Sequence, residues 1–357
     1  MRCDKERGGA WKIDIWVMVV LCALGVLLMN SCSREGGAGK AAVEPQVKVI
    51  YGYFDTVSML YSYAGDEAER FEENAQKVTE ILRDYHKLFD IYNQYEGMNN
   101  LCTVNQMAGG EPVKVDERLI EFLVFAKKMC EVTDGKMDVM MGAVTQLWHD
   151  ARENGRLPEN QAIVEAAQHV GIELLEIDEE NSTVRILDSK ASIDVGAIGK
   201  GYATEVAARY LSVVGATGYV LNTGGNVRCV GTKADGSAWS TGIRDPQRPE
   251  GVRVKLEIED CSCVTSGGYE RYLEVDGERY SHIIDKDTNW PARYWGSVTV
   301  ICEDSAVADA LATALFCMDY EHGRALVDAL DGVQCIWICE DGQVLCSEGL
   351  EGKLVML

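Results

Sequence analysis

The chain has 357 residues, of which 47% are hydrophobic and 25% are charged, a composition typical of a globular protein. Acidic residues outnumber basic ones by 57 to 34, which gives a formal net charge of −23. This charge repels polyanions, so neither nucleic acid nor an anionic lipid surface is expected as a partner. A substrate that carries phosphate would have to be held locally, by a metal ion or by backbone amides.

The N-terminal region has the pattern of an export signal. Basic residues precede an apolar run over 15–29, and Cys32 follows shortly after it. The run is shorter than the roughly 20 residues of a membrane-spanning helix, and its flanks are those of a secretory signal. We expect residues 1–31 to be a lipoprotein signal peptide, Cys32 to carry lipid, and residues 32–46 to be a flexible tether. The body would then be exported and anchored to the outer face of the bacterial cytoplasmic membrane; an uncleaved N-terminal anchor is the alternative.

The chain contains 13 cysteines and five histidines. Cys3 and Cys22 lie in the predicted signal and Cys32 would carry lipid, which leaves ten of the thirteen in the body. No C-x-x-C pair occurs, and no histidine lies near the closely spaced cysteines Cys261, Cys263, Cys335 and Cys339, so a zinc site is not expected. We expect buried free thiols, with one or two disulfides as the alternative.

Hydrophobic periodicity predicts the elements of the first half of the body. In chain order they are a strand pair over 47–63, a helix over 66–90, a polar loop over 89–105, and helices over 117–132 and 161–170. No internal repeat is visible.

A glycine-rich stretch, Ser192–Ala203, organises the second half. It joins a β-like run over 183–187, which resumes at Ala191, to a predicted helix over 202–211. A strand that turns through glycines into a helix N-terminus presents free N–H groups to an anion, and Lys200 adds a positive charge. The glycine spacing matches neither a P-loop nor a dinucleotide-binding fingerprint, so a turn that binds nothing is the alternative.

Two further turns follow predicted strands. A short apolar strand over 218–221 leads into the glycine turn Asn222–Asn226, and a hairpin is expected with its tip at Asp276–Gly277. The next strand delivers His282 three residues before Asp285. A histidine at a strand end is a candidate general base. The alternatives are a plain hairpin turn and a structural histidine.

An alanine-rich segment over 305–314 predicts a helix with Ser305 as its N-cap. Asp309 and Thr313 are four residues apart, so their oxygens project from one face of this helix. A carboxylate and a hydroxyl are hard oxygen ligands of the kind that Mg²⁺ accepts. The alternative is a threonine bonded to its own helix and an aspartate that interacts with the helix dipole.

Five segments recur in this order in one protein family. They are D-x-G-x-I-x-K-G-Y-A at Asp194–Ala203, N-x-G-G-N at Asn222–Asn226, T-S-G-x-Y-E-R at Thr265–Arg271, H-I-I-D at His282–Asp285 and A-D-A-L-A-T-A at Ala308–Ala314. Together they resemble the ApbE-type flavin transferases (FAD:protein FMN transferase). The likeness extends from Phe54 to the C-terminus, and such proteins are commonly bacterial lipoproteins.

This resemblance implies an activity and a fold. The activity would be Mg²⁺-dependent transfer of the FMN half of FAD to a threonine hydroxyl of an acceptor protein, through a phosphoester bond and with release of AMP. The acceptor would be a subunit of a membrane redox complex. The fold would be α/β (α+β) over residues 47–357, with mixed or antiparallel sheets, packed helices and two associated lobes around an FAD cleft.

The resemblance also assigns site residues. His282 matches the residue proposed to deprotonate the acceptor threonine. Asp309, Thr313 and the backbone carbonyl of Ala197 match the Mg²⁺ ligands. The positions that match contacts to FAD are Phe54, Tyr92, Lys136, Met137, Asp138, Asp194, Lys200 and Ile283.

The chain departs from the family pattern near the expected flavin pocket. Lys286 stands in place of a proline, Asn289 in place of a glycine, and Met140 and Met141 in place of a Thr-Val pair. These departures concern substrate geometry more than the class of reaction. Two other functions share the same residues: an FAD pyrophosphatase that yields FMN and AMP, and a lipoprotein that binds FAD without chemistry. The second would need neither a metal nor a base.

Overall fold

The computed structural model of the protein describes residues 44–357. The predicted signal peptide, the lipid-bearing Cys32 and nearly all of the tether lie outside the described residues. Across 44–357, none of the helices combines the length and the apolar character that crossing a membrane requires.

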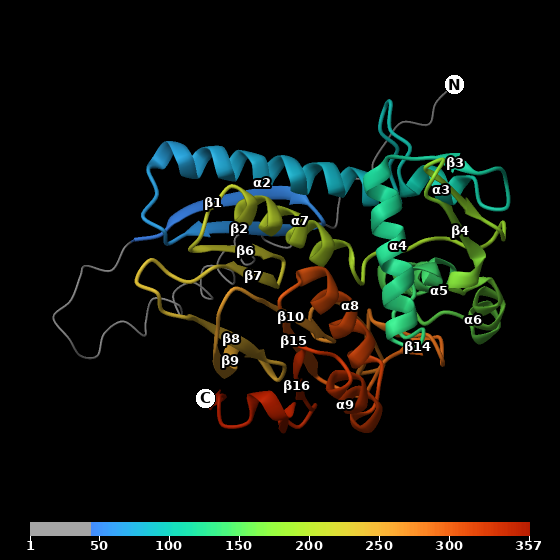
Figure 1. Ribbon diagram of the computed structural model, residues 1–357. Coiled ribbons are helices and arrows are strands. Elements are labelled where there is room, and N and C mark those ends of the chain that lie inside the picture. The colour runs from blue at the N-terminus through green and yellow to red at the C-terminus, as the bar shows by residue number, and fades with distance from the viewer. Residues whose placement is uncertain (1–43) are drawn as a thin grey trace.

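An eight-stranded sheet forms the centre of the molecule (Figure 1), and every strand pair in it is antiparallel. Its inner strands are apolar on both faces because both faces are covered; all six residues of β15, for example, are buried. In spatial order the strands are β1 (Gln46–Tyr53), β2 (Thr56–Ser62), β6 (Tyr219–Thr223), β7 (Asn226–Val230), β10 (Ser262–Gly267), β15 (Ser297–Cys302), β16 (Gln334–Ile338) and β17 (Val344–Cys346).

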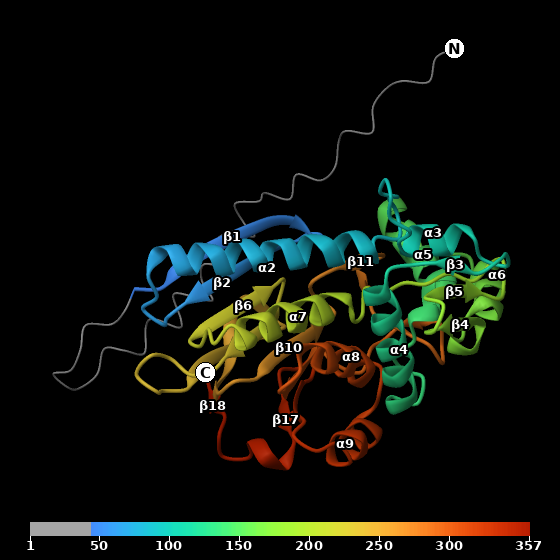
Figure 2. The same cartoon turned by 45° about the horizontal axis from the view of Figure 1, so that its top comes forward.

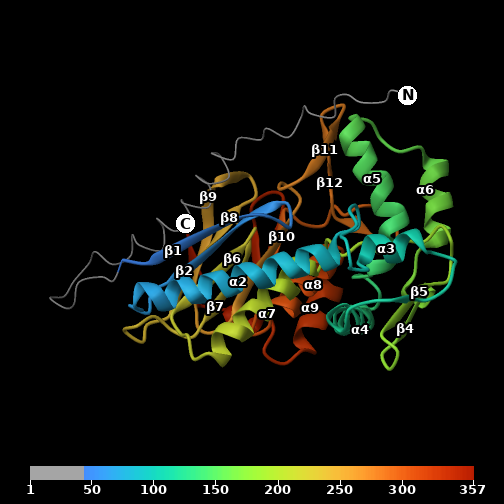
Figure 3. The same cartoon turned by 90° about the horizontal axis from the view of Figure 1, so that it is seen from above.

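Helices cover one face of this sheet. Figure 3 shows the long helix α2 (Ala68–Phe89) lying beside α7 (Gly199–Val213) and above the sheet, with α8 (Ser305–Phe316) further along. α2 is amphipathic and buries one stripe that includes Phe71, Val78 and Leu82. α8 is buried almost all round because it lies between α7 and strands β10 and β15. The short helix α9 (Tyr320–Asp328) follows it.

A second, smaller sheet covers the opposite face. Its strands are β8 (Trp239–Asp245), β9 (Arg248–Ile258) and β18 (Val355–Met356), in the order β18-β9-β8. Trp239, Val254 and Leu256 from this sheet pack with Met59 and Ile336 of the central sheet in a second hydrophobic cluster. The central sheet is therefore sandwiched between helices and strands, which explains why its inner strands do not alternate.

A second lobe lies at one end of the sheet. Figure 2 shows its helices gathered around a three-stranded sheet. Its elements are α3 (Leu101–Gln106), β3 (Val113–Lys114), α4 (Glu117–Val132), α5 (Gly142–Asn154), α6 (Asn160–Ala166), β4 (Leu175–Asp178) and β5 (Thr183–Ile186). Two small hairpins, β11 (Tyr272–Val275) with β12 (Glu278–Ser281) and β13 (Ile284–Asp285) with β14 (Trp290–Pro291), connect to this end.

The structure confirms the predicted α+β class with antiparallel sheets and packed helices. Three local predictions are wrong. The N-cap of α8 is Asp304, whose carboxylate accepts hydrogen bonds from the N–H groups of Ala306 and Val307, at 2.7 and 3.1 Å. The segment from Ala191 to Val195 is not a strand. The predicted loop over 89–105 contains α3, because Asn100 caps a helix there.

The ten cysteines of the body are all free thiols, and seven of them are buried. This confirms the expected free thiols for the described part of the chain. Burial raises the pKa of several of these thiols, among them Cys263, whose pKa is raised to about 12. Such thiols are protonated at neutral pH and chemically inert.

Candidate active site

The first turn of α7 meets the middle of α8, and the contact depends on Gly201. A Cβ at this position would lie 2.4 Å from the Cβ of Asp309 and 2.4 Å from the carbonyl oxygen of Ser305. Only glycine lets the two helices approach this closely. The N–H of Gly201 donates to Oδ2 of Asp309 at 2.7 Å, so the carboxylate lies at the positive end of α7.

Asp309 is a buried carboxylate without an ion pair in the part of the chain that the structure describes. Its Oδ2 accepts the N–H of Gly201, and the amide of Asn226 also acts on the carboxylate. Burial raises the pKa of Asp309, while the charge of Lys200, the N–H of Gly201 and the amide of Asn226 act in the opposite direction. A cation next to this carboxylate would offset the cost of burying its charge.

Thr313 lies one turn after Asp309 on the same helix. Its Oγ1 is 3.4 Å from the backbone oxygen of Ala197, just before α7. The predicted ligands Ala197, Asp309 and Thr313 therefore meet at the junction of α7 and α8. A carboxylate, a hydroxyl and a carbonyl form the kind of oxygen set that suits Mg²⁺. Among residues 44–357 there is no cluster of three or more His, Cys, Asp or Glu side chains that could hold a metal, so a metal here would depend on this mixed set.

His282 lies in the loop between β12 and β13. Its Nδ1 is 3.1 Å from the carbonyl oxygen of Arg271, and a carbonyl only accepts, so Nδ1 carries the proton. This tautomer leaves the lone pair of Nε2 free to accept a proton. The residue keeps contact with solvent, but closely packed protein atoms reduce its hydration. That lost hydration, together with the nearby charges of Arg271, Lys200 and Arg152, lowers the pKa of His282 to about 4.

Lys200 links the base to the metal ligands. Its charge acts on both His282 and Asp309, so the lysine lies within electrostatic reach of each. Its Nζ is 3.5 Å from the carbonyl oxygen of Gly196. Among the described residues it forms no ion pair with a carboxylate. The predicted base, lysine and metal ligands therefore occupy one region.

A small cavity of about 140 Å³ adjoins this region and is lined by Tyr92, Asp194 and Asn105, among others. Asp194 accepts hydrogen bonds from Thr145 Oγ1 at 2.7 Å and from the N–H of Gly196 at 2.9 Å. Tyr92 is 60% exposed, and burial of part of its ring together with the charges of Asp194 and Asp55 raises its pKa. An exposed aromatic ring beside a cavity can stack on a flat ligand.

The extended segment before α7 is held by a side chain. Asn105 donates from Nδ2 to the carbonyl of Ile193 at 2.9 Å and accepts from its N–H at 2.8 Å. Asn105 thus replaces the neighbouring strand that a β-segment would need. This explains why a β-like sequence is extended here without belonging to a sheet.

Phe54 forms the turn between β1 and β2 together with Asp55. Both residues have positive φ, 56° and 50°, as a two-residue hairpin turn requires. The ring of Phe54 packs edge-on against His86 and Phe89, which leaves it partly buried. The carbonyl of Asp55 accepts a hydrogen bond from Arg271 at 3.4 Å, so this turn lies next to the His282 loop.

Three ion pairs join the segment Lys136–Asp138 to the β13 turn. Lys136 pairs with Asp285 at 2.9 Å and with Asp287 at 2.8 Å. Lys286 pairs with Asp138 at 2.5 Å, and the side chain of Asp138 has no exposed surface. Asp138 also accepts from the N–H groups of Met140 and Ile172, at 2.8 and 3.1 Å.

This arrangement limits what the segment can offer a ligand. The side chain of Met137 is buried in the core, and the carboxylate of Asp138 is fully engaged by protein groups. Ile283 is buried as well, directly after His282. Two of the departures from the family pattern have physical reasons: Lys286 supplies the partner of Asp138, and Asn289 has a φ of 59°, which asparagine tolerates.

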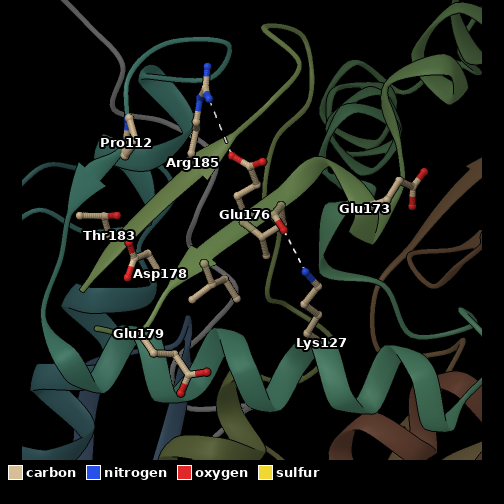
Figure 4. Close-up of a pocket in the computed structure, with 10 residues that line it drawn as sticks. Pro112, Lys127, Glu173, Glu176, Asp178, Glu179, Thr183 and Arg185 are labelled. Carbon is tan, nitrogen blue, oxygen red and sulfur yellow. Dashed lines mark hydrogen bonds and ion pairs between the residues drawn. The ribbon is translucent and has the colours of Figure 1, made fainter. Parts of the chain in front are cut away.

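A separate cavity of about 670 Å³ lies over the small sheet of the second lobe and α4 (Figure 4). Its lining includes Lys127 and four acidic residues. Lys127 donates to the carbonyl of Leu175 at 3.1 Å. None of the predicted site residues lines this cavity, so we do not assign the candidate site to it.

Several residues of the site carried no assignment from the sequence. Asn226 and Arg271 lay within quoted motifs without a role, and Arg152, Thr145 and Asn105 come from segments far away in the chain. The pairing of Asn105 with Ile193 spans 88 residues. Only the three-dimensional fold brings such residues together, so no local pattern identifies them.

Comparison with known proteins identifies the family. The sequence profile of the ApbE family matches residues 54–337. A protein of Treponema pallidum named FAD:protein FMN transferase is 29% identical over 97% of this chain and 96% of its own length. One from Vibrio cholerae with the same name is 33% identical over 70% of this chain and 76% of its own length.

Solved structures show the same relationship. The crystal structure of the ApbE protein from Thermotoga maritima superimposes with a TM-score of 0.78 at 30% identity, covering 87% of this chain and 99% of that one. The flavin transferase ApbE from Vibrio cholerae gives a TM-score of 0.73 at 26% identity, covering 86% and 99%. The chain described here belongs to the ApbE family.

Proposed function

We propose that this protein transfers FMN from FAD to a threonine hydroxyl of an acceptor protein and releases AMP. Similarity to proteins named FAD:protein FMN transferase supports the reaction class. The observation that carries the proposal is the junction of α7 and α8, where a set of oxygen ligands meets. The charge of Lys200 acts both on this set, at Asp309, and on the free base His282.

The oxygen set fits Mg²⁺. Asp309 contributes a buried carboxylate that has no ion pair in the described chain, Thr313 a hydroxyl and Ala197 a carbonyl. Mg²⁺ bound there would neutralise charge on the phosphate oxygens of FAD. These three residues would hold it, and Gly201 would fix the position of the carboxylate.

The protein's own residues supply proton transfer and positioning. In the proposed reaction, the threonine oxygen attacks the phosphorus on the FMN side, forming a phosphoester as the P–O–P bond breaks. AMP leaves with the bridging oxygen. His282 accepts the hydroxyl proton at Nε2, which is free because Nδ1 donates to Arg271. Lys200 offers a positive charge to the phosphate oxygens.

The finer assignments to FAD also belong to this proposal. Tyr92 and Phe54 offer aromatic surface, and Asp194 borders the small cavity. Lys136, Met137, Asp138 and Ile283 form the buried support behind the His282 loop. We therefore expect backbone groups, more than side chains, of residues 136–138 to face FAD.

We also propose that the protein is a lipoprotein anchored through Cys32 to the outer face of the bacterial cytoplasmic membrane. The basic and apolar pattern before Cys32 supports this. The acceptor would then be exposed on the same face, as a subunit of a membrane redox complex would be. Labelling of the mature N-terminus with a radioactive fatty acid tests the anchor, and Cys32→Ala should abolish the label.

The reaction is tested by mixing the purified protein with FAD, Mg²⁺ and a candidate acceptor that carries a threonine. Mass spectrometry of the acceptor is combined with an AMP assay, with and without a chelator. A gain of one FMN on the acceptor, matched by AMP and lost with the chelator, supports the transferase. AMP without any modified acceptor, across several acceptors, supports an FAD pyrophosphatase instead. FAD binding without AMP supports a binding protein.

A further inference from the structure

Three cationic side chains from separate elements lie within electrostatic reach of His282. Arg152 lies near the end of α5, Lys200 in the first turn of α7, and Arg271 in the loop before β11. All three act electrostatically on the histidine. The backbone of Arg271 is in direct contact with the histidine, because its carbonyl accepts from both the N–H and Nδ1 of His282, each at 3.1 Å.

These cations lack the partners that others in the same chain have. Arg118, Arg209 and Arg324 each pair with a carboxylate at 2.8 Å or less. Across residues 44–357, Arg152 and Arg271 form no ion pair. Arg271 donates only to the carbonyl of Asp55, at 3.4 Å, and Arg152 only to Nδ1 of His149, at 2.9 Å. Carboxylates are abundant in a chain of net charge −23, yet neither of these two arginines has one as a partner.

The two arginines also repel one another. Burial lowers the pKa of Arg152, and the nearby charge of Arg271 lowers it further. Holding like charges near one another costs free energy in the unliganded protein. A bound anion would remove that cost. Guanidinium groups match phosphate oxygens in a planar, two-pronged geometry.

The location indicates which anion. Arg152 acts on Tyr92, the exposed ring beside the small cavity, and Tyr92 packs near His149 at 6.0 Å between ring centres. Lys200 reaches the carbonyl of Gly196 at 3.5 Å from the first turn of α7, the turn in which Gly201 donates to Asp309. An anion held by all three cations would therefore lie between the aromatic cavity and the metal ligands, where the phosphates of a flavin dinucleotide belong.

We propose that Arg152 and Arg271, together with Lys200, form the site that holds the two phosphate groups of FAD. This inference rests on the proposed function, because it takes FAD to be the substrate. The arginines bind the phosphates from the side of His282, while the oxygen ligands at the α7–α8 junction lie on the other side. They also retain the phosphate of AMP as it leaves.

The test is equilibrium dialysis of FAD and of riboflavin, which lacks phosphate, against the full protein in the presence of a chelator, so that no turnover occurs. The variants are Arg152→Met and Arg271→Met, with Arg152→Lys and Arg271→Lys as conservative replacements. Arg279→Met is the matched control, since Arg279 lies on the neighbouring hairpin, pairs with Glu274 at 3.2 Å and covers the ring of Tyr272.

We expect each methionine variant to weaken FAD binding at least tenfold and to leave riboflavin binding within twofold of the original. The lysine variants should recover most of the loss, and Arg279→Met should change neither affinity. Thermal unfolding midpoints should not fall, because removing one of two repelling charges relieves strain in the unliganded protein. Unchanged FAD affinity, or an equal loss for both ligands, would overturn the inference.

The outcome is separable from that of the proposed function. If the variants lose FAD affinity but the original protein never modifies an acceptor, the phosphate site stands and the transferase proposal fails. If the original protein modifies an acceptor and the variants bind FAD normally, the transferase stands and the arginine site fails.

Discussion

Two buried carboxylates show how differently this fold treats the same chemical group. Asp138 has no exposed side-chain surface and is matched by Lys286 and two backbone N–H groups. Asp309 is 4% exposed, accepts one backbone N–H at 2.7 Å, faces Asn226 and has no ion pair within the described chain. A buried charge with full partners supports structure, whereas one without a cation is poised to bind one.

Asp309→Asn gives the sharpest test of this difference. Asparagine keeps the shape and the acceptor for Gly201 but removes the charge that a metal needs. We expect Mg²⁺-dependent FMN transfer to fall roughly 10³-fold, at the upper range for losing one electrostatic contact in an active site. Stability without metal should be unchanged or higher, because an unpaired buried charge is removed. Transfer is followed by mass spectrometry of the acceptor and stability by thermal unfolding in chelator.

Residual activity near the original level would exclude Asp309 from the metal site. A fall in stability as large as that caused by breaking the Asp138 ion pair would show that the two carboxylates are alike after all.

His282→Ala tests the other half of the site. Without the imidazole the acceptor hydroxyl keeps its proton, so transfer should slow by about 10²–10⁴-fold, the usual contribution of general base catalysis. FAD affinity should change little, since the predicted phosphate contacts come from other residues. The measurement separates the transfer rate at saturating FAD from the FAD dissociation constant. A variant that transfers FMN at nearly the original rate would place the base elsewhere.

Removing the cation that pairs with Asp138 should lower the stability of the protein, whereas neutralising Asp309 should not. Lys286→Met leaves a buried carboxylate without its cation, and we expect about 3 kcal/mol lower stability, the lower end for a broken buried pair because Lys286 itself is 27% exposed. Chemical denaturation gives the difference. The matched control is Lys190→Met, because the side chains of its pair with Glu165 are 60% and 61% exposed, and it should cost less than about 0.5 kcal/mol.

The double variant Lys286→Met with Asp138→Asn completes this comparison. Neutralising both partners should recover part of the lost stability. If the double variant is no more stable than Lys286→Met alone, the ion pair is not what holds the segment Lys136–Asp138 in place.

Much of the fold was predictable because its signals are local. The helix α4 begins and ends at the predicted residues, Glu117 and Val132, since helical periodicity and the Asp116 cap both lie within it. The strand pair predicted over 47–63 corresponds to β1 and β2. The spacing of Asp309 and Thr313 placed two proposed ligands on one helix face for the same reason.

The remainder depended on contacts that no short window contains. The partner of Asp138 is 148 residues away, and Asn105 substitutes for a strand next to Ile193, so the sequence around Ala191 looked like β structure. Arg152 lies on a helix whose sequence does not indicate that it is near His282. Long-range charge complementarity becomes visible only when the elements are placed in space.

The pH at which His282 takes up a proton distinguishes this histidine from one that is free in water. Lost hydration and the cations Arg271, Lys200 and Arg152 lower the pKa of His282 to about 4. A lowered pKa keeps the imidazole neutral above that value, so the basic form should be present throughout pH 5 to 8. An NMR titration of the imidazole signals, assigned with His282→Gln, should show the midpoint near 4. A midpoint at the ordinary value of about 6.5 would contradict the crowded, cationic setting.

The smallest expected effect concerns the start of α8, which carries Asp309. The carboxylate of Asp304 caps this helix by accepting from Ala306 and Val307, and it also pairs with Arg209 at 2.7 Å. Asp304→Ala should therefore cost about 1 kcal/mol, the usual value for losing a cap. Ser305→Ala should cost less than that, since Oγ of Ser305 is buried without a hydrogen-bond partner among the described residues. Equal losses of stability in denaturation experiments would restore Ser305 as the cap. The expected order would show that Asp304 determines where α8 begins, and therefore where Asp309 lies relative to the first turn of α7.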